Sequence, residues 1–454
     1  MGAARRTVGA VRRTEIGPAA TFDRAGGYNP PMRVFLGTLA AVLVFLAGTA
    51  AGAAGQSSPQ AALQQALNPL MGDMGSSSGA YVVDMDTGQV LYSVAADTGR
   101  LPASVEKIYT TSTALLRLGP TATFATSILG VGSQNPQGIW NGTLYLRGGG
   151  DPTLGAVGFD HAWYGSGTGT TFRTLVGALI RATGIKGIQG RIVADQSYFD
   201  MRRGTPATGF GPNLEVEGQL GGLMFDRGFT SVQGTAFQSH PALYAGQQLA
   251  NTMRAFGVKV GQGGRVPISS GRTPAGATLL ASVQSPPLST LIQLTNTPSD
   301  NYFAETLVKD IGARLGGAGT TAAGAAVVRA EMQSEFGITP RLNDGSGLSR
   351  YDSTSPVQVV TALEKLATNR PFVNSLAVMG ETGTLQDLGN NTVAQGNCIG
   401  KTGSLHDVAN QVGYCKARDG HTLVYAFLAN GLGDPDYVHG IEADMAVKLA
   451  GYDG

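Results

Sequence analysis

Two residues with the chemistry of a nucleophile and its base stand three positions apart in the first quarter of the chain. Of the eight lysines, only Lys107 has a serine three positions before it, Ser104. The apolar spacing of residues 104–119 predicts a helix that begins near Ser104, and residues i and i+3 of a helix share a face. Lys107 could then take the serine proton if burial or a second cation lowers its pKa. An exposed lysine on a helix surface is the alternative explanation.

A second group, Ser299-Asp300-Asn301, precedes a segment with helical spacing, residues 302–312. A hydroxyl and an amide in such a turn can relay a proton and hold a substrate carbonyl. The alternative is a simple helix cap, because Ser, Asp and Asn are all favoured at that position.

A third group, Lys401-Thr402-Gly403-Ser404, lies on a predicted strand. The lysine and threonine offer donors for a substrate carboxylate, and the glycine allows another backbone to approach closely. The amide of Ser404, with that of Ser104, could form an oxyanion hole. A surface lysine at the end of a strand is again the alternative.

The three groups occur in the order Ser-x-x-Lys, Ser-x-Asn, Lys-Thr-Gly, and each lies on the element that its chemistry needs. This pattern resembles the penicillin-binding DD-peptidases and serine β-lactamases. The chain is more similar to the class C group of DD-carboxypeptidases and endopeptidases, typified by the type-4 penicillin-binding protein. The resemblance spans roughly residues 80–430 and rests on segments such as LPASVEKIYTTSTALLRLGP, GTLYLRGGGDPTL, NDGSGLSR and GKTGSLHDVANQVGY.

The resemblance implies a role for each residue of the three groups. Ser104 would be the nucleophile and Lys107 its base, while Ser299 and Lys401 would relay a proton to the leaving D-alanine. Asn301 would hold the substrate amide. Thr402, Gly403 and Ser404 would line the substrate, and its terminal carboxylate would meet Lys401 and Thr402. A nearby cationic Lys401 would also help to keep Lys107 neutral, as a base must be.

Five further residues have weaker assignments. Leu348, Arg350 and Asp151 resemble family positions near the substrate side chain, where an Arg and an Asp could hold the two charges of a diamino acid. A turn and a structural ion pair explain them equally well. Cys398 and Cys415 lie symmetrically about a turn near residues 406–407, which suits a cross-strand disulfide, with two buried thiols as the alternative.

The expected fold is α+β, an α/β sandwich of the β-lactamase/DD-peptidase-like transpeptidase kind. An antiparallel sheet would carry helices on both faces and the active site at its edge. Residues 59–121 with 284–454 would form this split catalytic domain, and residues 122–283 an inserted, mostly β region. Within the insertion, residues 172–183 and 240–256 predict helices, and TLYLRGG, GRIVAD and GGLMF are strand-like.

The N-terminus predicts export. Residues 34–54 form an uncharged stretch that ends in small residues, as a signal peptidase requires, yet its length also suits a membrane-spanning anchor. Residues 1–31 are then an N-terminal extension and 32–55 a signal peptide or membrane tether, with cleavage and retention both open. The expected location is outside the cytoplasmic membrane, in the cell wall, secreted or anchored.

Composition argues against several other classes. The formal net charge of the 454 residues is +1, and no basic face of the kind found in nucleic-acid-binding proteins is evident. The five histidines form no spaced pair on a helix, so no metal site is expected. The glycine-rich runs lack a phosphate-loop lysine, and no cofactor is expected.

Three functions remain open at this stage. The first is a serine-type D-Ala-D-Ala carboxypeptidase or endopeptidase that acts on peptidoglycan stem peptides and is inhibited covalently by β-lactam antibiotics. The second is a serine β-lactamase or esterase on the same fold, and the third is a catalytically silent cell-wall binding protein. No extra base for rapid hydrolysis of a penicilloyl-enzyme is evident, so prolonged inhibition by penicillin is predicted.

Overall fold

The computed structural model describes residues 58–165 and 167–454, which belong to one compact unit, Ser57–Gly454. The expectations for residues 1–31 and 32–55, with the apolar stretch 34–54, lie outside the described residues. Within the described ranges, no helix is both long and apolar enough to cross a membrane.

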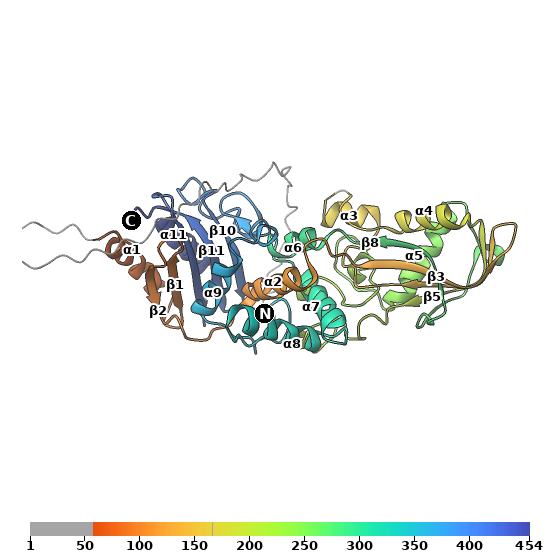
Figure 1. The fold of residues 1–454 in the computed structure, drawn as a ribbon, viewed down its shortest axis with the longest axis horizontal. Coiled ribbons are helices and arrows are strands. Elements are labelled where there is room, and N and C mark those ends of the chain that lie inside the picture. Colours follow the sequence, from red (N-terminus) through yellow and green to blue (C-terminus); the bar gives the residue numbers. More distant parts are fainter. Residues whose placement is uncertain (1–57, 166) are drawn as a thin grey trace, which may run out of the picture. The chain divides into compact units, whose positions relative to one another are not determined.

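The first sheet is antiparallel and has six strands in the order β2-β1-β12-β11-β10-β9 (Figure 1). The strands are β1 (Gly79–Asp84), β2 (Val90–Val94), β9 (Ala377–Val378), β10 (Cys398–Leu405), β11 (Val408–Lys416) and β12 (Thr422–Asn430). The chain therefore builds this sheet from its N-terminal hairpin and its last three long strands, which pair through β1 and β12.

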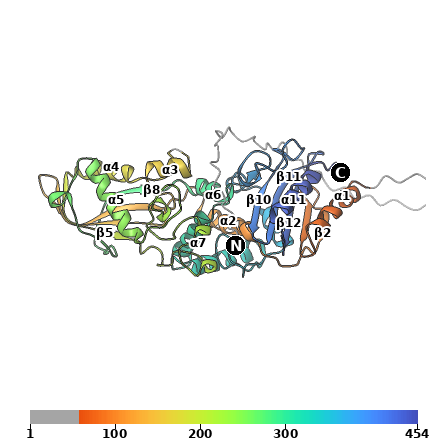
Figure 2. The same cartoon turned by 180° about the vertical axis from the view of Figure 1, so that it is seen from behind.

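Helices cover both faces of this sheet (Figures 1 and 2). One face packs on α1 (Pro59–Asp73) and α11 (Pro435–Ala450). The other packs on α2 (Lys107–Leu118), α6 (Leu288–Asn296), α7 (Asn301–Leu315), α8 (Thr321–Glu331), α9 (Pro356–Leu366) and α10 (Arg370–Val373). The predicted α/β sandwich is confirmed.

Strand β12 shows why the sequence pattern suits a central strand. Val424, Ala426 and Leu428 belong to the core on the α2 side, whereas Tyr425 and Phe427 belong to the core on the α1 and α11 side. Because alternate residues point to opposite faces and both faces are covered, the strand is apolar throughout.

A second sheet lies within residues 122–284, with strand order β6-β5-β4-β3-β8 and β7 paired to β5. Its elements are β3 (Ala125–Gln134), β4 (Ile139–Arg147), α3 (Val157–Trp163), α4 (Phe172–Thr183), β5 (Gly187–Asp195), α5 (Pro241–Ala255), β6 (Lys259–Val260), β7 (Ile268–Ser270) and β8 (Thr278–Gln284). The segment is thus mixed, with α4 and α5 packed on the sheet in a separate core.

The two predicted helices of this segment are present, and α4 has the predicted bounds. Thr171 caps its first turn and Gly184, with φ +64°, ends it. The prediction of a strand at GGLMF is wrong. A β-carbon on Gly222 would lie 2.8 Å from the Gln196 carbonyl oxygen, so this glycine serves close packing of irregular backbone.

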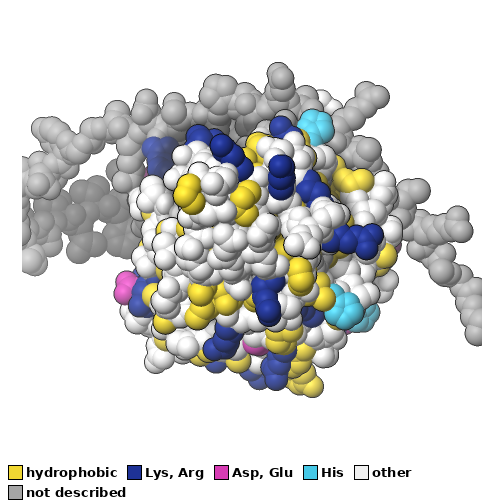
Figure 3. Space-filling model, turned by 90° about the vertical axis from the view of Figure 1, so that its right-hand side faces the viewer, with side chains coloured by type: hydrophobic (Ala, Val, Ile, Leu, Met, Phe, Trp, Pro, Cys, Tyr) yellow, Lys and Arg dark blue, Asp and Glu magenta, His cyan; other side chains and the backbone are white. Residues whose placement is uncertain are grey.

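The surface of this segment is basic. Residues 122–283 contain twelve Lys or Arg and seven Asp or Glu. Figure 3 views the side that carries the second sheet, and Lys and Arg side chains are spread across it with few acids. The expectation that the chain has no basic face is therefore wrong for this side, because acids elsewhere in the chain balance the total charge.

Candidate active site

Ser104 and Lys107 are brought together by a tight turn at the start of α2. Residues Ala103–Glu106 form a 3-10 turn that runs directly into α2 at Lys107. Residues three apart nearly eclipse one another in such a turn, and Lys107 Nζ lies 2.7 Å from Ser104 Oγ. Ala103 holds a φ of +46°, which is unusual for a residue with a side chain and fixes the entry into the turn.

The Ser-Asp-Asn group occupies the loop between α6 and α7. Asp300 is the N-cap of α7 and accepts a hydrogen bond from the Phe303 amide, so the capping interpretation holds for this residue. The side chains of Ser299, which has φ +67°, and Asn301 instead contact the two lysines. Lys107 Nζ donates to Asn301 Oδ1 at 2.6 Å, so the second group touches the first.

The third group completes the cluster from strand β10. Lys401 is fully buried, and its Nζ donates to Ser299 Oγ at 2.7 Å. A β-carbon on Gly403 would lie 2.6 Å from the Pro102 carbonyl oxygen and 3.2 Å from the Ser104 amide nitrogen. The glycine therefore lets β10 pass directly against the turn that carries Ser104.

Burial shapes the electrostatics of both lysines. Burial lowers the pKa of Lys107 to about 8, although the charges of Glu217 and Asp300 oppose this shift. Burial also lowers the pKa of Lys401, helped by the nearby charge of Lys107. A lysine of lowered pKa can act as a base near neutral pH.

Residues of the segment 122–283 also enter this site, and the sequence motifs did not predict them. Glu217 Oε2 accepts the Asn301 amide at 2.9 Å, and the Glu215 carbonyl oxygen accepts from Asn301 Nδ2 at 2.7 Å. Burial, with the charge of Asp300, raises the pKa of Glu217 to about 7. In the sequence, Glu215 and Glu217 are marked only as two neighbouring acids in a glycine-rich stretch of the kind that forms loops.

Arg227 links the same segment to the helix cap. Its guanidinium is buried and ion-paired with Asp300, and Tyr164 Oη accepts a hydrogen bond from its Nε at 2.9 Å. Four aromatic rings surround the guanidinium, those of Trp163, Tyr164, Tyr302 and Phe303. The cap of α7 is thus held by a charge pair in which the guanidinium is buried and the Asp300 side chain is 13% exposed.

Three buried carboxyl groups lie beneath the Ser104 turn. Oxygen atoms of Glu106, Asp344 and Asp352 come within 4.8 Å of one another, and this is the one group of possible metal-ligating side chains within residues 58–165 and 167–454. Burial raises the pKa of Glu106 well above its usual range, and the neighbouring acids add to the shift. The cluster therefore retains protons that isolated acids would lose.

Two of the residues assigned to the substrate side chain, Arg350 and Asp151, are held by partners other than the two lysines. Arg350 is exposed and forms a two-pronged ion pair with Asp407 at 2.6 and 2.9 Å. Asp151 is buried, and its carboxylate accepts hydrogen bonds from Thr153 and Thr170. These contacts correspond to the structural alternative that the sequence left open. Leu348 is partly buried and packs against the core that contains α2.

Three other features flank β10. Thr402 Oγ1 lies 2.8 Å from Thr384 Oγ1, and Ser404 Oγ lies 2.6 Å from His439 Nε2 on α11. Cys398 and Cys415 are directly opposite in the β10–β11 register and are joined by a disulfide.

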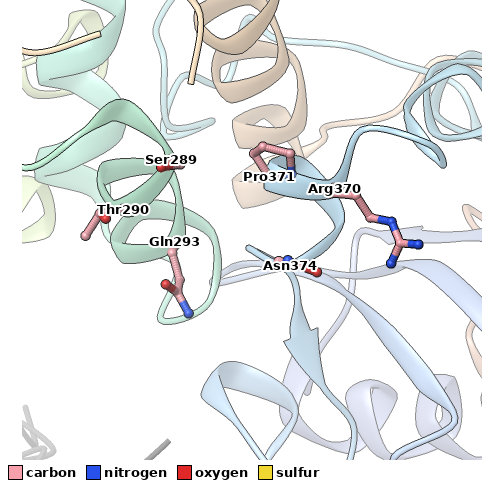
Figure 4. Close-up of a pocket in the computed structure, with 6 residues that line it drawn as sticks. All are labelled: Ser289, Thr290, Gln293, Arg370, Pro371 and Asn374. Carbon is pink, nitrogen blue, oxygen red and sulfur yellow. The ribbon is translucent and has the colours of Figure 1, made fainter. Parts of the chain in front are cut away.

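A separate surface hollow of about 270 Å³ lies between α6 and α10 (Figure 4). Its lining residues are Ser289, Thr290, Gln293, Arg370, Pro371 and Asn374. None belongs to the three groups, so this hollow is distinct from the Ser104 site.

The sandwich and the pair formed by Ser104 and the buried Lys107 define the class of serine acyl-transfer enzymes with a β-lactamase/DD-peptidase-like fold. The chain belongs to the D-Ala-D-Ala carboxypeptidase 3 (S13) family, whose model matches residues 60–239 and 221–451. It is accordingly a hydrolase of the serine peptidase type.

Individual relatives agree with this assignment. The chain is 32% identical to a carboxypeptidase of Mycolicibacterium smegmatis, over 78% of this chain and 76% of the relative. It is 29% identical to a D-alanyl-D-alanine carboxypeptidase of Actinomadura sp., over 84% and 82%. The crystal structure of penicillin-binding protein 4 from Haemophilus influenzae shares the fold, with a TM-score of 0.69 at 22% identity, covering 85% of this chain and 99% of that one.

Proposed function

We propose that this protein removes or cuts at D-alanine in peptidoglycan stem peptides through an acyl-enzyme on Ser104. The observation that carries the proposal is the contact of Lys107 Nζ with both Ser104 Oγ and Asn301 Oδ1, beside a second pair formed by Lys401 and Ser299. The relatives' carboxypeptidase names support the choice of substrate.

In the first step Ser104 Oγ attacks the carbonyl carbon of the penultimate D-alanine, and Lys107 Nζ takes the hydroxyl proton. The new O–C bond leaves a tetrahedral oxyanion, which the amides of Ser104 and Ser404 would face. Asn301 would hold the substrate amide. Lys107 can act this way because burial lowers its pKa to about 8.

In the second step the C–N bond breaks, and a proton reaches the leaving nitrogen through the Ser299 hydroxyl. Lys401 contacts that hydroxyl at 2.7 Å and can restore its proton. Water then adds to the acyl carbon and passes a proton through Ser299 to Lys401, which gave one up in the preceding step. The O–C bond to Ser104 breaks, Ser104 regains its proton from Lys107, and the shortened peptide leaves.

Thr402, Gly403 and Ser404 would line the substrate together with Lys401. Lys401 and Thr402 would meet the terminal carboxylate, and the small Gly403 keeps the strand close to Ser104. Arg350 and Leu348 remain proposals for contact with the peptide side chain. Asp151 would act indirectly, since its carboxylate is enclosed by threonines.

The wider assignment is part of the same proposal. Residues 59–121 with 284–454 would be the catalytic domain and 122–283 the insertion. Residues 32–55 would export the protein, with 34–54 either removed or kept as a membrane tether, because peptidoglycan lies outside the cytoplasmic membrane. β-Lactam antibiotics would acylate Ser104 as substrate mimics.

The test is covalent labelling by a fluorescent penicillin, with Ser104→Ala alongside. We expect stable labelling of the wild-type protein and none of the variant. A well-folded wild-type protein that is never labelled would contradict the catalytic proposal and favour a cell-wall binding protein.

A second candidate, a serine β-lactamase, is favoured by one observation. Glu217, with a pKa of about 7, is an additional base beside Asn301 that the sequence did not reveal. If Glu217 activated water, penicillin would be turned over rapidly instead of remaining bound. The decay rate of the labelled enzyme separates the two candidates.

A further inference from the structure

A chain of three polar side chains extends from β10 to α11. Ser404 Oγ lies 2.6 Å from His439 Nε2, and His439 Nδ1 lies 2.8 Å from Glu442 Oε2. The side chain of His439 is 13% exposed and that of Glu442 is fully buried, whereas Ser404 faces solvent. Nothing in the mechanism above uses His439 or Glu442.

The hydrogen bonds restrict what Ser404 can do with its proton. The Glu442 carboxylate accepts from Nδ1, so Nε2 of a neutral His439 carries no proton and must accept the Ser404 O–H. When His439 is protonated, Nε2–H donates to Ser404 Oγ instead. The Ser404 O–H is then free to donate a hydrogen bond to another acceptor.

The position of Ser404 indicates which acceptor that would be. Ser404 stands two residues after Thr402 on β10, and side chains at i and i+2 of a strand point to the same face. Lys401 and Thr402 are the residues proposed to meet the terminal carboxylate of the substrate. The Ser404 hydroxyl therefore shares a strand face with Thr402, whereas the side chain of Lys401 points to the other face, toward Ser299.

We propose that His439, held by Glu442, is a specificity-determining positioning residue that turns the Ser404 hydroxyl toward the substrate's terminal carboxylate and adds a positive charge beside it. The effect would favour peptides that end in a free D-alanine over bonds inside a cross-link, which present no carboxylate there. This inference rests on the proposed function and deepens it.

The charges around His439 support a role near neutral pH. Burial opposes protonation, but the hydrogen bond and charge of Glu442, with the charge of Asp436, raise the pKa of His439. Lys401 is the cation that acts against it. The acids of α11 thus stabilise the protonated form of His439, and Lys401 on β10 destabilises it. An incoming substrate carboxylate would screen these two cations from each other.

The experiment uses two peptides that differ only at the terminus. One is an N-acetylated peptide ending in D-Ala-D-Ala, and the other is the same peptide with a C-terminal amide. Cleavage of either gives the same shortened product, so kcat/KM can be compared directly. Ser104→Ala must abolish cleavage of both.

The variant is His439→Gln, which keeps a hydrogen-bonding side chain but removes the charge. We expect kcat/KM for the free-acid peptide to fall about tenfold, mainly through KM, as expected for loss of one charge-assisted hydrogen bond. Cleavage of the amide should change less than twofold. The matched control is His421→Gln, since His421 is also bound to an acid, Asp84, at 2.9 Å, outside the site.

The ratio of kcat/KM for acid over amide should also fall as pH rises in the wild-type enzyme and fall less steeply in His439→Gln, where only loss of the Lys401 charge still weakens binding of the carboxylate. Titration of Lys107 or Glu217 affects both peptides and cancels in this ratio. The double variant Ser404→Ala/His439→Gln should reduce kcat/KM for the free-acid peptide no further than Ser404→Ala alone does, because His439 acts through Ser404.

Failure of the inference is distinct from failure of the proposed function. If the wild-type enzyme cleaves neither peptide, the proposed function fails, and the inference with it. If both peptides are cleaved and His439→Gln slows them equally, only the inference is overturned. Hydrolysis that persists in Ser104→Ala but needs His439 would instead make Ser404 a nucleophile, which also overturns it.

Discussion

Gly403 and Ser104 lie so close that a β-carbon on the glycine would be 3.2 Å from the serine amide nitrogen and 2.6 Å from the Pro102 carbonyl oxygen. Real β-carbons essentially never come within 3.0 Å of another atom, the contact at 3.2 Å is also unusually tight, and both neighbours are backbone. Any side chain at position 403 must therefore displace β10 from the turn that carries the nucleophile.

Gly403→Ala should lower the rate of acylation by penicillin by about 100-fold, because a displacement of about 1 Å misaligns the oxyanion donors. The second-order acylation constant measures this. Gly72→Ala, on α1 with no atom within 4 Å of the new β-carbon, is the control and should acylate normally. Equal rates for both variants would show that β10 does not shape the site.

Acylation should depend on pH through Lys107. Because only the neutral amine can accept the Ser104 proton and the pKa of Lys107 is about 8, the acylation constant should rise about tenfold per pH unit below that value and level off above it. Lys107→Arg, which cannot lose its proton, should abolish acylation.

Lys309→Arg serves as the control for that change, since Lys309 is also buried but is paired with Asp200 away from Ser104. A profile that rises with a midpoint near 6 instead of 8 would assign the base to another group.

Glu217 should set the pH at which the acylation constant rises. Its negative charge raises the pKa of Lys107, so Glu217→Gln should lower that pKa and move the rise of acylation to lower pH by about 0.5–1 unit. The glutamine oxygen can still accept from the Asn301 amide. Glu215→Gln is the control, because Glu215 contacts Asn301 only through its backbone carbonyl.

A different result for Glu217→Gln would reassign the residue. If the variant acylates normally at every pH but releases penicilloate more than tenfold more slowly, Glu217 acts as the base for hydrolysis. Stopped-flow acylation and the decay of labelled enzyme distinguish these outcomes.

The sandwich was predicted from the resemblance of the three motifs to the DD-peptidases, whereas single helices and strands follow from local signals. The helix α4, for example, follows from the helical spacing of residues 172–183. The strand prediction at GGLMF is wrong because a short apolar run with glycines is equally compatible with buried irregular backbone.

The parts of the site that were missed depend on contacts between distant positions. Glu217 meets Asn301 from 84 residues away, and Ser404 meets His439 from 35 residues away. No spacing rule connects such pairs, since the insertion and the final helix are placed by packing of whole elements. The net charge likewise concealed the basic surface in Figure 3, because it sums over the whole chain.

The last prediction concerns stability and the buried acid Glu106. Burial raises its pKa in the folded state, so the folded protein keeps a proton that the unfolded chain loses above about pH 4.5. The contribution of Glu106 to stability should be greatest below that pH and decline as pH rises, by up to about 1.4 kcal/mol per pH unit for one retained proton. Glu106→Gln removes this proton and its share of the decline, whereas Asp344, whose pKa is also raised by burial, keeps its own share.

Thermal unfolding from pH 5 to 8 tests this expectation. The Tm of Glu106→Gln should exceed that of the wild-type protein by a margin that grows with pH, whereas the exposed Glu335→Gln should show no such trend. If Glu106→Gln is instead less stable at every pH, and a chelator lowers only the wild-type Tm, Glu106, Asp344 and Asp352 act as ionised ligands of a cation. The change in Tm with pH therefore decides whether protons or a metal ion neutralise the carboxyl groups of Glu106, Asp344 and Asp352.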